Sequence, residues 1–447
     1  MAGGGSPFSR ERKPVSNTHP NLRLVDVPPE ALTPLFATSL YPEQTYPALR
    51  EQWGNVAPVE LDGGVPAWLV LEWDDCLRVM REGNFSRDVT HWKAFQDGQV
   101  QPGTGLYAFF MPRDNAYYTD GTRQERLRQV VDDAFTTVNE HNLAADMRAA
   151  CDQMLAHVVR DGRTSADLVT EYTTFVPALA VGAMYGLGAD DALQFAQWAK
   201  DIFSNTPAAG PAFMGINGML THLIEQRKRY PQDDVLSAIV HWRDPLRPDD
   251  PTFHLTDKEM LDTAQMVQSA GHEMAAAWCT TALVHILSDR AFGTRTLRGR
   301  LSVDEALDSV LINASPTANT PCRFVKADVQ IGGRMVHKGD AIVAAVGRAT
   351  KEKHAGSDPV WDLTSKATLA WGAGAHRCPA DRLSRIIVEQ AIEAVLQRLS
   401  ALRLTVPASE LGVGVSLFSL RADRLPVEFD AVTQYDEQWN TTTAWAS

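Results

Sequence analysis

One cysteine of this chain stands in a setting that favours a reactive thiolate. The segment from Trp371 to Ala380 reads WGAGAHRCPA, and a long amphipathic run follows it. Glycines such as Gly372 allow the backbone to turn tightly and to expose its N–H groups. Cys378 comes just before a predicted helix, whose partial positive charge lowers the pKa of a nearby thiol. We therefore predict a thiolate in a tight loop, suited to holding a metal cofactor.

The residues beside this cysteine indicate which cofactor. His376 and Arg377 add donors for anionic groups. Haem requires both features, because its iron accepts a thiolate and its propionates need cationic or hydrogen-bonding partners. A lone cysteine before a helix is more often a packed core residue. The assignment to haem therefore depends on further landmarks elsewhere in the chain.

A long predicted helix carries the second group with chemical potential. It covers residues 255–289, with Thr256 as N-cap and Glu259 three residues later, the pattern of a capping box. Its second half is apolar on most faces, so we expect it to cross the protein interior. Glu273 lies within that half, and ionised side chains are seldom buried without a partner or a task. His272 points to the other side and is assigned no role.

Helical periodicity dominates the rest of the chain, with a strand-like piece at residues 65–72, a hairpin and a further strand at residues 327–346, and another hairpin at residues 414–429. The predicted fold class is mainly α with small peripheral β-sheets. We predict a disordered extension at residues 1–29, one domain at residues 30–432 and a flexible tail at residues 433–447.

Composition excludes several classes of protein. The net charge of −13, with no basic segment, argues against a nucleic-acid binder. Five scattered cysteines without a C-x-x-C pair exclude a disulfide framework and a zinc ribbon. The start of the chain lacks the apolar core of a signal peptide, and no segment is long and apolar enough for a membrane span. We expect a cytoplasmic protein that does not bind membranes.

The spacing G-x-G-x-H-x-C resembles the haem loop of cytochromes P450. Three further segments resemble landmarks of that family in the same order: residues 119–136 its haem-contacting helix, residues 270–274 (AGHEM) its oxygen-binding stretch, and residues 321–340 its arginine-then-hairpin segment. FSRD at residues 85–88 matches soluble bacterial members. The resemblance implies the P450 fold and haem b (Fe-protoporphyrin IX), with Cys378 as the axial iron ligand.

The resemblance also implies a set of haem contacts. Arg128 and Arg323 match residues that bind haem propionates, and Gln124 stands where many bacterial members have a haem-contacting histidine. The remaining contacts implied by the match are His376, Trp371, Gly372 and Ala270. By the same match, the substrate would touch Trp92, Phe95, Ser315, Asn319 and Phe418, although each of these five could equally be a core or surface residue.

One family motif is missing. The K helix of the family carries E-x-x-R, and the matching positions 309–312 here read SVLI, without either charge. Glu305 and Asp308 lie nearby, but neither is followed by an arginine three residues later. Because both partners are absent together, no unpaired charge is left in the core, and we expect the fold to survive. In this respect the chain resembles an actinobacterial subgroup that lacks the motif.

The second departure concerns catalysis. The family pairs an acid with a threonine that relays protons during oxygen activation; Glu273 keeps the acid position, but Met274 replaces the threonine. A thioether donates no proton, and the next hydroxyls on this helix, Thr280 and Thr281, lie nearly two turns away. We therefore hypothesise that an N–H or O–H group of the substrate completes the relay.

That hypothesis favours oxidative C–C or C–N coupling of an aromatic natural product, such as a tryptophan-containing cyclic dipeptide. The alternatives are a conventional hydroxylase with a water relay and a non-catalytic haem-binding protein. We expect a monomer that receives electrons from a ferredoxin and an NAD(P)H-ferredoxin reductase. An acidic partner would dock near Arg128, Arg377, Arg382 and Arg385.

Overall fold

The computed structural model describes residues 21–202, 207–250, 253–289, 292–293, 296, 302–355 and 365–430. Residues 1–20 of the predicted extension and the predicted tail at residues 433–447 lie outside this range. Residues 21–29 contain the 3-10 turn η1 (Leu24–Asp26), in which Leu24 is buried. The described residues form two compact units, one from residues 21–112 and 319–349, the other from residues 113–318 and 350–430.

The first unit is built on a mixed sheet of six strands in the order β1-β2-β3-β9-β6-β4. β2 and β3 pair antiparallel with Val59 opposite Ala67, and β3 runs parallel to β9 with Leu69 opposite Val343. Both central strands are almost entirely buried, as expected for a sheet covered on two faces. The strands and helices of this unit are β1 (Thr33–Pro34), β2 (Val56–Leu61), β3 (Val65–Val70), β4 (Phe85–Ser86), β6 (Thr320–Val325), β9 (Ala341–Ala344), the hairpin β7 (Val329–Ile331) and β8 (Arg334–Val336), η2 (Pro29–Ala31), η3 (Val89–His91), α1 (Leu35–Leu40), α2 (Pro42–Trp53), α3 (Trp73–Arg81), α4 (Lys93–Gln96) and α5 (Gly105–Phe110).

The second unit is mainly helical. Its helices are α6 (Gly121–Thr136), α7 (Glu140–Val159), α8 (Phe175–Met184), α9 (Ala189–Ile202), α10 (Ala209–Arg229), α11 (Val235–Val240), α12 (Asp257–Ser288), α14 (Val303–Asn313) and α16 (Asp381–Arg398), with short turns η4 (Arg160–Gly162), η5 (Val169–Thr173), η7 (Gly374–His376) and η8 (Ala408–Glu410). Its strands are β5 (Ser165–Asp167), β10 (Arg403–Leu404), β11 (Val413–Val415), β12 (Leu420–Ala422) and β13 (Pro426–Glu428). α15 (Val346–Lys353) contains the point after residue 349 at which the chain passes from the first unit to the second.

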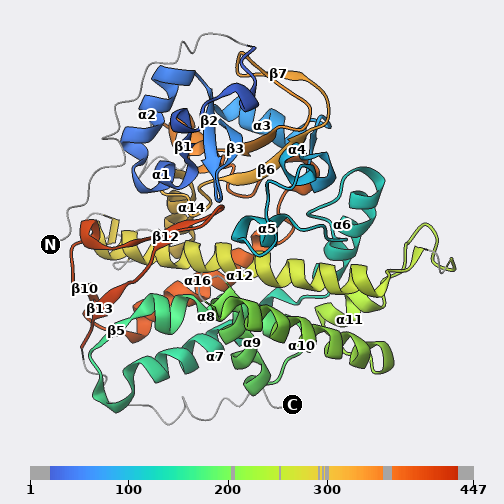
Figure 1. Ribbon diagram of the computed structural model, residues 1–447. Helices are drawn as coiled ribbons and strands as arrows, with labels where there is room; N and C mark the ends of the chain where they lie inside the picture. Colours follow the sequence, from blue (N-terminus) through green and yellow to red (C-terminus); the bar gives the residue numbers. More distant parts are fainter. Residues whose placement is uncertain are drawn as a thin grey trace. The chain divides into compact units, whose positions relative to one another are not determined.

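α12 is the central element of the second unit. It begins at the predicted capping box, in which the Glu259 N–H donates to the Thr256 hydroxyl (3.2 Å) and the Thr256 N–H donates to the Glu259 carboxylate (3.0 Å). α8, α14 and α16 pack against it (Figure 1). Its second half, from Ala275 to Leu283, is buried on most sides, because alanines and other apolar residues surround the helix axis there. The predicted fold class, mainly α with small sheets, is confirmed.

Among the described residues, no helix is both long enough and apolar enough to cross a membrane.

Candidate active site

The Cys378 loop is a closed turn. Its backbone takes up positive φ at Gly372 (67°) and Gly374 (70°), a conformation that favours glycine. The turn η7 begins at Gly374, and the Cys378 N–H donates to the Trp371 carbonyl oxygen over 2.8 Å. α16 begins at Asp381, so Cys378 stands just ahead of a helix N-terminus, as the sequence predicted.

The pKa of the Cys378 thiol differs from the sequence prediction. Burial raises the pKa of the Cys378 thiol above its ordinary value, although the Ala380 N–H and the charges of Arg128 and Arg377 act in the opposite direction. The prediction that the helix terminus lowers this pKa is therefore wrong in its net direction, because the desolvation of the sulfur is the larger effect. Coordination to iron is what would deprotonate the thiol.

Helix α6 anchors the loop through its backbone. Gln124, which is buried, donates to the Ala375 carbonyl oxygen over 2.8 Å. Arg128 donates to the Arg377 carbonyl oxygen and pairs with Asp132 over 2.7 Å. Two of the predicted haem residues thus contact the carbonyl groups of the loop, and their contact with haem stays a prediction.

His376 and Trp371 fix the two sides of the turn. The His376 ring nitrogen Nε2 lies 3.0 Å from the carbonyl oxygen of Thr119, which precedes α6. The Trp371 ring meets the Trp278 ring of α12 edge-on, with 5.3 Å between the ring centroids. The loop is therefore held by α6 on one side and by α12 on the other.

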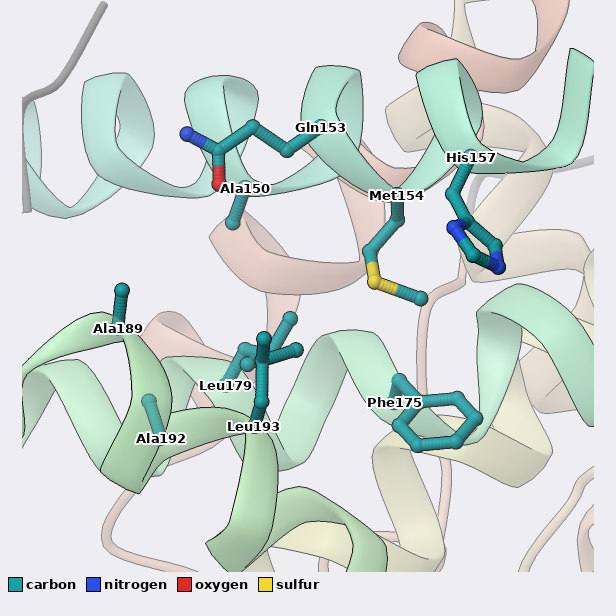
Figure 2. A pocket seen from close by; sticks show the side chains of 9 residues that line it. All are labelled: Ala150, Gln153, Met154, His157, Phe175, Leu179, Ala189, Ala192 and Leu193. Atoms are coloured by element: carbon teal, nitrogen blue, oxygen red, sulfur yellow. The ribbon is translucent and has the colours of Figure 1, made fainter. Parts of the chain in front are cut away.

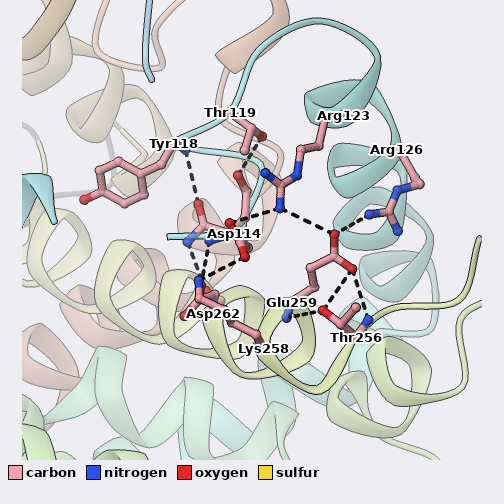
Figure 3. Close-up of polar contacts among 10 residues, drawn as sticks. Asp114, Tyr118, Thr119, Arg123, Arg126, Thr256, Lys258, Glu259 and Asp262 are labelled. Atoms are coloured by element: carbon pink, nitrogen blue, oxygen red, sulfur yellow. Dashed lines mark hydrogen bonds and ion pairs between the residues drawn. The ribbon is translucent and has the colours of Figure 1, made fainter. Parts of the chain in front are cut away.

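An ion network holds the segment that leads into α6 (Figure 3). Asp114 pairs with Lys258 (3.0 Å) and with Arg123 (3.0 Å). The Asp114 N–H donates to the Asp262 carboxylate over 2.6 Å, and Glu259 pairs with Arg126. The first turns of α12 thereby fix the chain that carries Thr119, Gln124 and Arg128. No local sequence pattern signals these contacts.

Glu273 of α12 is bound to the C-terminal hairpin. The Ser419 hydroxyl donates to the Glu273 carboxylate over 2.6 Å, and the Arg421 guanidinium lies 4.0 Å from the second carboxylate oxygen. The neighbouring His272 ring is buried and lies 2.9 Å from the Thr174 carbonyl oxygen. Glu273 therefore has a partner that the sequence did not reveal.

A hydroxyl group lies next to Met274. The Thr317 hydroxyl donates to the Met274 sulfur over 3.6 Å, from the segment that follows α14. Thr317 and Ser419 form an isolated β-bridge, so the two hydroxyl-bearing residues are neighbours. Thr280 instead contacts the Ala276 carbonyl oxygen (2.9 Å) and the hydroxyl of Thr173 (2.7 Å). A search along α12 alone misses Thr317 because it lies 43 residues further along the chain.

The chemistry of this unit fits haem. Cys378 is half-buried, and the cation Arg128 donates to the carbonyl oxygen of the preceding residue, Arg377. Ala270 is exposed in the middle of α12, although Gln268 and His272, two positions away on either side, are buried. A small exposed side chain permits a flat ring to approach the helix closely. These three residues would hold the group, which supplies the oxygen chemistry of the enzyme when bound.

The other predicted residues of the second unit have local partners. Ser315 is buried and its hydroxyl donates to the Thr317 carbonyl oxygen over 3.1 Å. The Phe418 carbonyl accepts from the Ala318 N–H over 3.0 Å, and the Phe418 side chain is half-buried. Both residues therefore lie on the segments that bring Thr317 and Ser419 together.

Four predicted residues belong to the first unit. Trp92 is buried in its core, where it stacks on Phe324 with 5.1 Å between ring centroids. Phe95 is half-buried and stacks on Tyr107. Arg323 lies buried in β6. Asn319 is also buried, and its amide oxygen accepts no hydrogen bond from the residues described.

The four arginines of the predicted docking surface are all paired with carboxylates. Their partners are Asp132 for Arg128, Asp381 for Arg377, Glu140 for Arg382, and Asp304 and Asp308 for Arg385. An acidic protein would have to compete with these carboxylates, so the surface is less cationic than its arginines alone indicate.

A groove of about 310 Å³ lies between α7, α8 and α9 (Figure 2). Its lining is mostly apolar and consists of Ala150, Gln153, Met154, His157, Phe175, Leu179, Ala189, Ala192 and Leu193. None of the residues predicted to bind haem or substrate lines this groove.

Comparison with known proteins places the chain in a family. No protein-family model matches it. The chain is 27% identical over 381 residues to cytochrome P450 CYP107DY1 of Priestia megaterium, covering 81% of this chain and 90% of the relative. It is 27% identical over 362 residues to nocardicin C N-oxygenase of Nocardia uniformis subsp. tsuyamanensis, covering 79% and 87%. The structure of CYP154A1 from Streptomyces coelicolor A3(2) superimposes with a TM-score of 0.74 at 25% identity, covering 89% and 99%.

The fold, the cysteine loop and these relatives define a haem-thiolate enzyme. The chain is a cytochrome P450, an oxidoreductase with haem as its cofactor, which confirms the resemblance found in the sequence. The non-catalytic alternative loses its support, because the relatives are named as oxygenases and hydroxylases.

Proposed function

We propose that this cytochrome P450 couples an aromatic secondary metabolite oxidatively, forming a C–C or C–N bond, and that a tryptophan-containing cyclic dipeptide is its substrate. In such a reaction one new bond replaces two bonds to hydrogen. Dioxygen accepts the two electrons and two protons released, together with two electrons from a ferredoxin and two protons from solvent, and is reduced to two molecules of water. We place the reaction in the cytoplasm, in a monomeric enzyme served by an NAD(P)H-ferredoxin reductase.

The observation that carries this proposal is the arrangement at Glu273 and Met274. The carboxylate accepts a hydrogen bond from Ser419 over 2.6 Å, and the next side chain ends in a thioether. α12 therefore presents no acid–hydroxyl pair at these two positions, and a thioether cannot pass a proton. A substrate with an N–H or O–H group can supply the missing donor, and an indole N–H has that property.

A second candidate function is monooxygenation of the same class of substrate. It is favoured by the Thr317 hydroxyl, which lies 3.6 Å from the Met274 sulfur and offers a donor from another segment. The name of the relative nocardicin C N-oxygenase describes insertion of oxygen rather than coupling.

One experiment separates the two functions. The enzyme is incubated with ferredoxin, reductase, NADPH and a set of tryptophan-containing cyclic dipeptides, in parallel for the wild type and Thr317→Val. Coupling gives products that have lost two hydrogens per bond formed, at similar rates in both proteins. Monooxygenation gives products that have gained one oxygen, and Thr317→Val then slows them by about 10²-fold, the usual contribution of a positioned proton donor.

A product of substrate plus one oxygen, with no coupled species, would refute the coupling proposal. Thr317→Ser serves as the matched control, since it retains the hydroxyl and removes only a methyl group.

A further inference from the structure

Asp308 is a buried carboxylate on α14, the helix in which the E-x-x-R motif of the family is missing. Asp308 of α14 has a side chain only 5% exposed. Arg385 donates to one of its oxygens over 2.5 Å, and the Lys366 ammonium lies 2.5 Å from the other. Each oxygen of the carboxylate thus faces a cation. Such pairing is what makes burial of a charge tolerable, and removing one partner from a buried set is strongly destabilising.

The two cations come from opposite flanks of the Cys378 loop. Lys366 precedes Trp371, where the loop begins, and Arg385 lies in the second turn of α16, directly after the loop. Arg385 also pairs with Asp304, one turn earlier on α14. A single carboxylate on α14 therefore draws both ends of the loop towards the same helix.

Aromatic contacts continue from this cluster to the loop itself. The Arg385 guanidinium lies over the Trp278 ring, 5.5 Å from its centroid, in a cation–π geometry. The Trp278 indole N–H donates to the Leu307 carbonyl oxygen of α14 over 3.3 Å. The same indole meets the Trp371 ring edge-on, and the Trp371 carbonyl oxygen accepts a hydrogen bond from the Cys378 N–H. Contact is continuous from Asp308 to the backbone of the cysteine.

The segment before the loop has a second attachment to α14. The Thr368 hydroxyl lies 3.4 Å from the Leu311 carbonyl oxygen. Pairing with Asp308 raises the pKa of Lys366, so this amine keeps its charge throughout the neutral range. The attachment of residues 366–368 to α14 therefore combines an ion pair with a hydrogen bond.

We propose that Asp308, Lys366 and Arg385 form an ionic clamp that positions the Cys378 loop for haem binding. The clamp uses none of the four positions, 309–312, at which the sequence lacks its expected charges. Its members touch neither Cys378 nor its neighbour Arg377 among the contacts described, and they act through Trp278 and Trp371. They are positioning residues. The proposal is independent of whether the enzyme couples or oxygenates its substrate.

The test compares two buried carboxylates in the haem-loaded enzyme. Asp308→Asn removes the charge at the clamp, and Asp234→Asn is the matched control, because Asp234 is also 5% exposed and pairs with Arg227 over 2.6 Å. Three quantities are measured: the unfolding midpoint, the reduced carbon-monoxide difference spectrum, which reports thiolate ligation, and the rate of haem transfer to apomyoglobin.

We expect both variants to lower the unfolding midpoint, but only Asp308→Asn to change the haem site. That variant should lose most of its thiolate-type carbon-monoxide band and release haem about 10-fold faster, the lower end of the effects seen when a partner of a metal ligand is removed. If Asp308→Asn keeps the wild-type band and the haem release rate of Asp234→Asn, the clamp is ordinary core structure and the proposal fails.

A second pair of variants decides the matter if Asp308→Asn does not fold. The Lys366 side chain is 55% exposed, so Lys366→Met is compatible with folding. It should shift the carbon-monoxide spectrum and haem release in the same direction, and Lys366→Arg should restore both. Identical spectra and release rates for Lys366→Met, Lys366→Arg and the wild type would overturn the proposal.

Discussion

The contact between Ser419 and Glu273 gives a prediction that separates an anchoring carboxylate from a catalytic one. The Ser419 hydroxyl donates to Glu273 over 2.6 Å, and the Glu273 side chain is 10% exposed. The second carboxylate oxygen accepts no hydrogen bond from the described residues, and Arg421 lies 4.0 Å from it. Ser419→Ala therefore removes the hydrogen bond that the Glu273 carboxylate accepts from the described residues.

The magnitude follows from the charge of the acceptor. A hydrogen bond to a charged group contributes about 1.5–3 kcal/mol, whereas one between neutral groups contributes about 1 kcal/mol. Ser419→Ala should therefore lower the free energy of unfolding by about 2 kcal/mol in the wild type but by only about 1 kcal/mol in the Glu273→Gln background. The difference, about 1 kcal/mol, is the coupling energy of the pair.

The assay is urea unfolding of the four haem-loaded proteins of this cycle, together with substrate titration. The hairpin β11–β12 carries Phe418, which is predicted to touch the substrate, so loosening it should also weaken substrate binding in Ser419→Ala if that prediction is right. Additive effects of the two substitutions, within about 0.5 kcal/mol, would contradict the anchoring role. A Glu273→Gln variant with unchanged stability and lost turnover would instead assign this carboxylate to proton delivery.

Two further predictions test the loop and a half-buried histidine. Gly372→Ala places a side chain on a residue with φ of 67°, so it should lower the free energy of unfolding by about 1–2 kcal/mol. Gly218→Ala in α10 is the control, because the added methyl group meets open space and should not destabilise the protein. Equal unfolding midpoints for the two variants would contradict this prediction. Burial lowers the pKa of His285, so the unfolded chain binds a proton more readily and stability falls as the pH drops through about 6.5. His285→Leu should flatten the dependence of the unfolding midpoint on pH between about 7 and 5, and an unchanged slope would show that other groups are responsible.

The parts of the site that are local in sequence could be predicted. The turn glycines, Cys378 and the following helix lie within a few residues of one another, so their spacing alone indicates the loop. The capping box at Thr256 and Glu259 is local in the same way, and the structure confirms it.

The contacts made by distant segments could not be predicted. Thr317 reaches Met274, and Ser419 reaches Glu273 over 146 residues of sequence, and neither pairing has a periodic signal. The pKa of Cys378 was misjudged for a related reason: helix position can be inferred from sequence, but the burial that outweighs it depends on how the whole unit packs.

The dispersal of the Asp308 cluster over three segments has a consequence for recognising and recombining such enzymes. A search that demands two charges on one helix will pass over any protein in which the charges are shared between a helix, the approach to the cysteine turn and the helix beyond it. A spatial template of one acid and two bases would find them. For the same reason, chimaeras that exchange only one of the three segments with a relative would carry mismatched charges into the interior, so the crossover points should keep all three from the same parent.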